Sequence, residues 1–187
     1  MRKIKLFNTF ELFAKAEERA FENYDEDKKP VFSVTKAPEE LPTDGRPSVF
    51  LAGSIEMGKA EDWQAKVQDL LKDENVAVYN PRRDDWDSSW EQKMENPQFR
   101  EQVEWELNAL DRSSVIIMYF DPNTKSPITL LELGIHAQSG KLLVCCPEGF
   151  YRKGNVDITC AKYSIPTFQT IEELTAAAIT KIKSMYA

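Results

Sequence analysis

Three acidic residues, Glu106, Asp121 and Glu132, are the side chains of this sequence with the strongest potential for chemistry. Glu132 shares a narrow polar stripe with Thr129 and His136, on a predicted helix whose other positions are mostly apolar. Since a helix buries its apolar face, we expect the stripe to face either a cleft or open solvent. Asp121 directly follows a predicted strand and lies in the loop that leads to this helix, so one cleft can hold all three carboxyl groups.

Glu106 belongs to the helix predicted over residues 98–110, and there it falls within an apolar stripe. That stripe consists of Phe99, Val103, Leu107 and Leu110, whereas Glu101 and Glu104 lie off it. A carboxylate on a core-facing stripe either pairs, holds a raised pKa or lines a cavity. The alternative is a side chain at the edge of the stripe that reaches solvent, because glutamate is long.

Two or more carboxyl groups around a sugar acetal are what glycosyl transfer needs. One attacks or stabilises the anomeric carbon, while another manages the proton of the leaving group. A 2-deoxy sugar lacks an electron-withdrawing hydroxyl group and so reaches a cation-like transition state more easily. This chemistry requires no metal, and we expect no cofactor.

The elements that must position these residues are predicted from short apolar runs that alternate with helical patterns. The runs predict strands at residues 48–52, 76–79, 115–120 and 142–146, and the patterns predict helices at 60–71, 98–110 and 127–139. Such alternation is typical of an α/β fold with a parallel sheet and helices on both faces. A last helix begins near Thr170, where Thr170 and Glu173 fit a capping box.

The helix over residues 127–139 has clear boundaries and one unusual residue. Ser126 is expected to cap its start with Pro127 in the first turn, and Gly140 is expected to end it. Gly134 lies in mid-helix, where glycine costs about 1 kcal/mol relative to alanine. We therefore expect close packing or a close ligand at Gly134.

Ligands of open parallel sheets bind beyond the carboxyl ends of the strands. The candidate binding residues there are Gly53, Ser54, Ile55, Asn80, Arg82 and Arg83. The two arginines have two open interpretations, which are ion pairs with Asp84, Asp85 and Asp87 or the binding of a phosphate or a base.

The segment from Gly53 to Lys59 matches the G-x-x-x-x-G-K phosphate loop, and this raises the possibility of an NTPase. Ala60 stands where a hydroxyl side chain would bind magnesium, and Glu56 would place a negative charge in the phosphate cradle. The alternative is a strand-to-helix turn whose glycines allow a tight backbone.

Composition limits the class of protein. The 187 residues carry a net charge of −7, which disfavours binding to nucleic-acid polymers. No apolar stretch is long enough for a signal peptide or membrane span, so we expect a cytoplasmic protein without a membrane partner. The three cysteines lack metal-binding spacing and are expected to be buried free thiols, and a single histidine disfavours a zinc site.

The first 44 residues differ from the rest. Residues 7–21 fit a helix, and a charged run at 25–29 followed by several prolines indicates an extended connection. We therefore divide the chain into an N-terminal arm, residues 1–44, and one domain, residues 45–187. The alternative for the arm is a poorly ordered tail.

Three sequence motifs together resemble the nucleoside 2-deoxyribosyltransferase superfamily. They are VFLAGSI at residues 49–55, NPRR at 80–83 and SPITLLELG at 126–134. The resemblance runs from about Val49 to Phe168 and implies a single-domain flavodoxin-like (Rossmann-like) fold. It also implies that Glu132 is the nucleophile and that Asp121 holds or protonates the nucleobase. Glu106 stands where well-known members have an aspartate.

The resemblance implies further that Asn155 contacts the sugar in a neighbouring subunit, and hence a homo-oligomer, a dimer or larger, with shared active sites. The expected substrates are a deoxynucleoside and a nucleobase, between which the 2-deoxyribosyl group is transferred through a glutamyl-sugar ester. One alternative is an N-glycosidase that hydrolyses the same bond in a deoxynucleoside or its 5′-monophosphate. Another is a nucleotide-binding protein without turnover.

Overall fold

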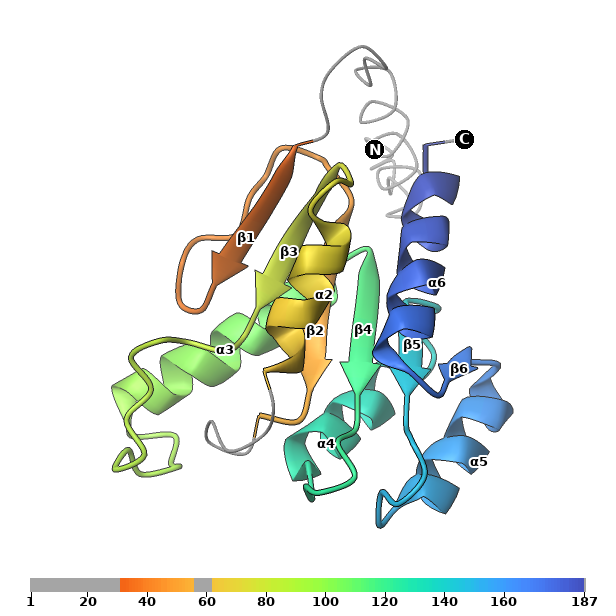
Figure 1. The fold of residues 1–187 in the computed structure, drawn as a ribbon. Helices are drawn as coiled ribbons and strands as arrows, with labels where there is room; N and C mark the ends of the chain where they lie inside the picture. The colour runs from red at the N-terminus through yellow and green to blue at the C-terminus, as the bar shows by residue number, and fades with distance from the viewer. Residues whose placement is uncertain (1–30, 56–61, 187) are drawn as a thin grey trace, which may run out of the picture.

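Strands and helices alternate along the chain in the computed structural model, which describes residues 31–55 and 62–186 (Figure 1). In chain order the elements are β1 (Phe32–Lys36), β2 (Ser48–Gly53), α2 (Trp63–Leu71), β3 (Val76–Asn80), α3 (Pro97–Arg112), β4 (Val115–Tyr119), α4 (Pro127–His136), β5 (Leu142–Cys145), α5 (Lys153–Tyr163), β6 (Thr167–Phe168) and α6 (Ile171–Ser184). No helix within these two ranges is long and apolar enough to cross a membrane.

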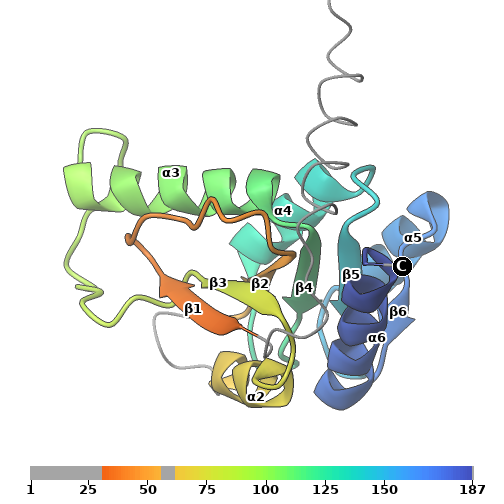
Figure 2. The same ribbon diagram turned by 90° about the horizontal axis from the view of Figure 1, so that it is seen from above.

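The six strands form one sheet in the order β1-β3-β2-β4-β5-β6, and all neighbouring strands are parallel. Helices α3 and α4 cover one face, and α2 and α6 cover the other (Figure 2). Apart from β1, the strand order is that of the flavodoxin-like fold, in which ligands bind where the order reverses. The predicted parallel sheet with helices on both faces is confirmed, and the reversal lies between β2 and β4.

The strands are continuous apolar runs because both faces of the sheet are covered. Along β2, Val49 and Leu51 pack under α2 and α6, whereas Phe50 and Ala52 pack under α3 and α4. The three cysteines are buried and free, as expected. Successive strand side chains therefore point to opposite faces of the sheet, and they form two apolar layers, one on each face.

The N-terminal arm predicted over residues 1–44 contains a strand that the sequence analysis did not predict, at Phe32–Lys36. These residues form β1, which pairs with β3 over five residues, from Phe32 with Val76 to Lys36 with Asn80. Phe32 and Val34 pack partly on the core, and the intervening residues are polar, as suits an edge strand. The helix predicted over residues 7–21 lies outside the described residues.

One helix boundary also differs from the predictions, and two elements were not predicted. Helix α4 ends at His136 rather than at residue 139, and Gly140 takes its left-handed conformation in the following turn. Helix α5 and the short strand β6 were not predicted. Helix α6 begins where expected, because Thr170 and Glu173 form the predicted capping box.

Candidate active site

The carboxyl ends of β2 and β4 meet at the point where the strand order reverses. There Gly53 has a φ of +150°, and a Cβ atom on it would collide with the backbone oxygen of Tyr119 and lie 2.8 Å from the Trp63 ring. The Trp63 indole N–H donates to the Ser54 carbonyl oxygen at 3.0 Å, which fixes the start of α2 against this turn. Only glycine fits here, so Gly53 shapes the site through its backbone.

A cluster of buried hydroxyl groups joins this turn to the loop before α4. The Ser54 hydroxyl accepts from the Asp121 backbone N–H at 2.9 Å and from the Thr124 hydroxyl at 2.9 Å, and it also contacts the Ser126 hydroxyl. Ser126 has a φ of +44°, and its side chain does not cap α4. Ser126 is thus the N-cap residue before Pro127, as predicted, but it makes no capping hydrogen bond because its hydroxyl bonds within the cluster instead.

Asp121 begins this loop and is 8% exposed. One of its carboxylate oxygens accepts from the backbone N–H of Asn123 at 2.8 Å and from the Asn123 side chain at 3.1 Å. The other oxygen has no hydrogen bond to a described residue. Asp121 is thus held in place at the carboxyl end of β4 with one acceptor available.

Helix α4 buries its polar stripe and exposes its apolar one. Glu132 is 7% exposed and His136 is 6% exposed. In contrast, Ile128, Leu131 and Ile135 are each more than half exposed. Of the two predicted outcomes for the stripe, open solvent is therefore excluded, and Glu132 points into the protein.

Glu106 lies on α3, the helix beside α4 on the same face of the sheet (Figure 2). Its side chain is half-buried, and one carboxyl oxygen accepts from the Gln102 amide at 2.8 Å. The buried face of α3 is formed by Gln102, Trp105, Ala109 and Leu110 rather than by the whole predicted stripe. Of that stripe only Leu110 is fully buried, because the helix is rotated so that Leu107 reaches solvent.

The carboxyl groups of Glu106 and Glu132 interact electrostatically. Burial raises the pKa of Glu132 to about 8, and the nearby Glu106 raises it further as a second cause. Burial also raises the pKa of Glu106 to about 7, against a lowering hydrogen bond from Gln102. Both carboxyl groups therefore hold a proton more strongly than an exposed carboxyl group does, which suits them to general acid–base chemistry near neutral pH.

The two arginines after β3 have different surroundings. Arg83 is largely buried, bonds Asp85 through two nitrogens at 2.6 and 2.9 Å, and stacks over Trp90 at 5.0 Å. Arg82 is half-buried, and its nearest carboxylate, on Asp62, is 3.9 Å from Nη1. The ion-pair interpretation thus describes Arg83, whereas Arg82 has only the long contact with Asp62. Among the described residues, Nη1 of each arginine is buried without a hydrogen bond.

The remaining predicted site residues have supporting or distant positions. Asn80 is buried and accepts from the Arg82 backbone N–H at 2.9 Å, which shapes the loop after β3. Ile55 is half-buried and is the last residue described before residues 56–61, so most of the phosphate-loop motif lies outside the described residues. Asn155 is exposed in the first turn of α5.

The close packing expected at Gly134 is absent from the part of the chain that the structure describes. A Cβ atom on Gly134 would meet nothing within 4 Å.

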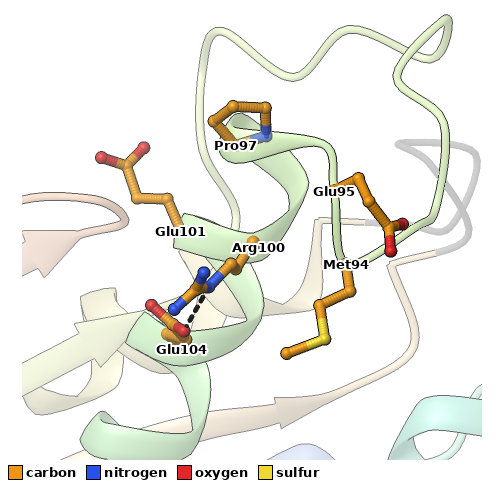
Figure 3. A pocket seen from close by; sticks show the side chains of 6 residues that line it. All are labelled: Met94, Glu95, Pro97, Arg100, Glu101 and Glu104. Carbon is orange, nitrogen blue, oxygen red and sulfur yellow. Dashed lines mark hydrogen bonds and ion pairs between the residues drawn. The ribbon is translucent and has the colours of Figure 1, made fainter.

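A shallow depression of about 430 Å³ lies elsewhere, at the start of α3 (Figure 3). Its lining is Met94, Glu95, Pro97, Arg100, Glu101 and Glu104, and the Arg100–Glu104 ion pair of 2.6 Å crosses it. It includes none of the predicted site residues. We therefore place the candidate site at the carboxyl ends of β2 and β4 and between α3 and α4.

Gln102 is a residue of this site that the sequence analysis missed. Its amide nitrogen donates to Glu106 and to the backbone oxygen of Pro81, both at 2.8 Å. The available signal was its spacing four residues before Glu106, which places both side chains on neighbouring positions of one helix.

The buried His136 side chain also has an unpaired polar atom. Among the described residues its Nε2 atom has no hydrogen-bond partner, and burial lowers the pKa of the imidazole.

Comparisons with known proteins identify the family. The model of the family described as nucleoside 2-deoxyribosyltransferase like matches residues 46–150, which include Glu106, Asp121 and Glu132. No curated protein matches the sequence. Among solved structures, a conserved protein from Enterococcus faecalis V583 has a similar fold, with 13% identity and a TM-score of 0.53 over 74% of this chain and 98% of that one. The chain belongs to the nucleoside 2-deoxyribosyltransferase-like family.

Proposed function

We propose that the protein transfers a 2-deoxyribosyl group between nucleobases through a covalent ester on Glu132. The observation that carries this proposal is the pair of interacting carboxyl groups on neighbouring helices, with Glu132 buried and Glu106 half-buried. Family membership supports small-molecule nucleosides as substrates. Burial of a carboxyl pair is costly to the folded state, and a catalytic use of the pair explains why it is present.

The reaction requires the pair to divide its roles. The Glu132 carboxylate attacks C1′ of the sugar, and the C1′–N bond breaks with its electron pair going to the base. The departing base takes a proton from Glu106 or Asp121. An incoming base then attacks C1′ of the ester, gives its ring N–H proton to Glu106 or Asp121 and releases the Glu132 carboxylate, which restores the enzyme.

Hydrolysis of a deoxynucleoside 5′-monophosphate is the second candidate, and Arg82 favours it. Its buried Nη1 has no hydrogen-bond partner and lies near the strand ends where ligands bind. A guanidinium group whose ion pair is as long as the 3.9 Å contact with Asp62 is suited to a phosphate. In this case water rather than a base resolves the ester on Glu132.

We also propose that the protein acts as a homo-oligomer that uses the outer face of α4. This face exposes Ile128, Leu131 and Ile135, and the ionisable residues of the helix, Glu132 and His136, both point inward. An uncharged apolar face is suited to a second copy of a chain whose net charge is −7, because like charges do not meet there. The exposed Asn155 is proposed to reach the sugar in a partner's site.

An exchange assay tests the proposed activity. The full-length protein is incubated with a panel of purine and pyrimidine deoxynucleosides and a different free base, and products are separated by chromatography. We expect the deoxynucleoside of the added base, and loss of nearly all turnover in Glu132→Ala. Free deoxyribose without exchange supports the hydrolase. Neither product from any donor would refute both catalytic proposals and favour a binding protein.

A further inference from the structure

The Gln102 side chain is held in one orientation. It is 4% exposed, and its nitrogen donates to the Pro81 carbonyl oxygen and to Glu106 Oε1, both at 2.8 Å. A primary amide has two N–H groups, so both of its donors are occupied. The direction of the carbonyl oxygen, Oε1, is therefore fixed as well.

This carbonyl oxygen is buried and has no hydrogen-bond partner. Buried acceptors in folded proteins are nearly always paired, and an unpaired one calls for an explanation. Because the other end of the amide contacts Glu106, the unpaired oxygen lies beside the proposed proton donor. A ligand that supplies an N–H group at this position would satisfy it.

Together the side chains of Glu106 and Gln102 present a hydrogen-bond donor next to a hydrogen-bond acceptor. Protonated Glu106 donates, and Gln102 Oε1 accepts. Adenine offers the complementary pair, since its N7 accepts and the adjacent 6-amino group donates, and cytosine offers N3 and its 4-amino group. Guanine and hypoxanthine place a carbonyl oxygen where the amino group would be, so two acceptors would face each other.

We propose that Gln102 is a specificity-determining residue whose carbonyl oxygen accepts a hydrogen bond from the exocyclic amino group of the departing base. The preferred donors are thus the deoxynucleosides of adenine and cytosine over those of keto bases. This inference rests on the proposed function of Glu106 and Glu132. During the reaction the Glu106 proton moves to the ring nitrogen as the C1′–N bond breaks, and the Gln102 N–H then stabilises the Glu106 carboxylate.

The test compares kcat/KM for 2′-deoxyadenosine and 2′-deoxyinosine as donors to one common acceptor base. The wild-type protein is expected to favour 2′-deoxyadenosine, and Gln102→Leu is expected to reduce that ratio at least about tenfold. Gln98→Leu, an exposed position on the same helix, serves as the matched control and keeps the wild-type ratio. Comparison of this ratio between the wild type and each variant cancels the intrinsic difference between the two leaving bases.

A substrate analogue provides a second test that needs no variant. The purine 2′-deoxynucleoside with hydrogen at position 6 lacks the amino group, so its kcat/KM on the wild type is expected to be at least about tenfold below that of 2′-deoxyadenosine. Turnover with equal kcat/KM for these donors, or an unchanged ratio in Gln102→Leu, would overturn the role of Gln102 but not the transferase. Absence of turnover with every donor would instead overturn the proposed function itself.

Discussion

Replacement of Glu132 by glutamine is expected to stabilise the folded protein at alkaline pH while it abolishes turnover. The side chain is 7% exposed, and burial together with Glu106 raises its pKa from 4.5 to about 8. Between these two pH values the unfolded chain has lost the proton of Glu132 and the folded chain keeps it. The folded protein therefore loses stability as the pH rises through this window.

The size of this stability loss follows from the same pKa shift of Glu132. Each pKa unit corresponds to about 1.4 kcal/mol, so the ionised Glu132 costs the folded state up to about 5 kcal/mol above pH 8. Movement of the side chain and entry of water reduce this cost, and a difference of about 2 to 4 kcal/mol is expected at pH 9. At pH 5 the folded chain keeps the proton and the unfolded chain has lost most of it, but this pH lies only slightly above the unfolded pKa of 4.5, so the difference is expected to be no more than about 1 kcal/mol.

The assay is urea unfolding of the wild type and Glu132→Gln at pH 5, 7 and 9, followed by circular dichroism. The free energy of unfolding of the variant is expected to exceed that of the wild type by an amount that grows with pH. Glu95→Gln, at an exposed position, is the control and is expected to differ from the wild type equally at each pH. A difference for Glu132→Gln that does not change with pH would refute the buried-pair argument.

Four further substitutions test other parts of the structure. Gly53→Ala is expected to prevent stable folding because its Cβ collides with backbone, whereas Gly134→Ala meets open space and is expected to raise stability by up to about 1 kcal/mol in thermal unfolding. Leu131→Glu places a charge on the outer face of α4 and is expected to convert the proposed oligomer to a monomer in light scattering; an unchanged mass would count against that interface. Arg82→Gln is expected to lower kcat/KM for a deoxynucleoside monophosphate at least about tenfold and to leave the nucleoside unaffected, if phosphate is its ligand.

The sheet was predictable because its central strands are buried on both faces. Runs such as residues 115–120 then stand out as uninterrupted apolar segments, whatever their partners are. The capping box at Thr170 was equally visible, since it depends on two side chains three residues apart. Strand β1 was missed because an edge strand alternates with polar residues and resembles an extended linker.

The site was only partly predictable, because its decisive contacts join distant parts of the chain. Glu132 and Asp121 were identified from local pattern and from resemblance. The hydrogen bond from Gln102 to Pro81 spans 21 residues, and the hydroxyl cluster joins Ser54 to Ser126 across 72. The sequence pattern of α4 also did not reveal which of its two stripes faces inward, since that depends on what packs beside it.

Covalent trapping tests the central claim most directly. A 2-fluoro-2-deoxy nucleoside slows breakdown of a glycosyl ester, and peptide mass spectrometry of the treated protein then locates the modified residue. The account predicts a single sugar adduct on Glu132, absent from Glu132→Gln. A stable adduct on any other residue, or turnover of deoxynucleosides that persists in Glu132→Gln, would contradict it.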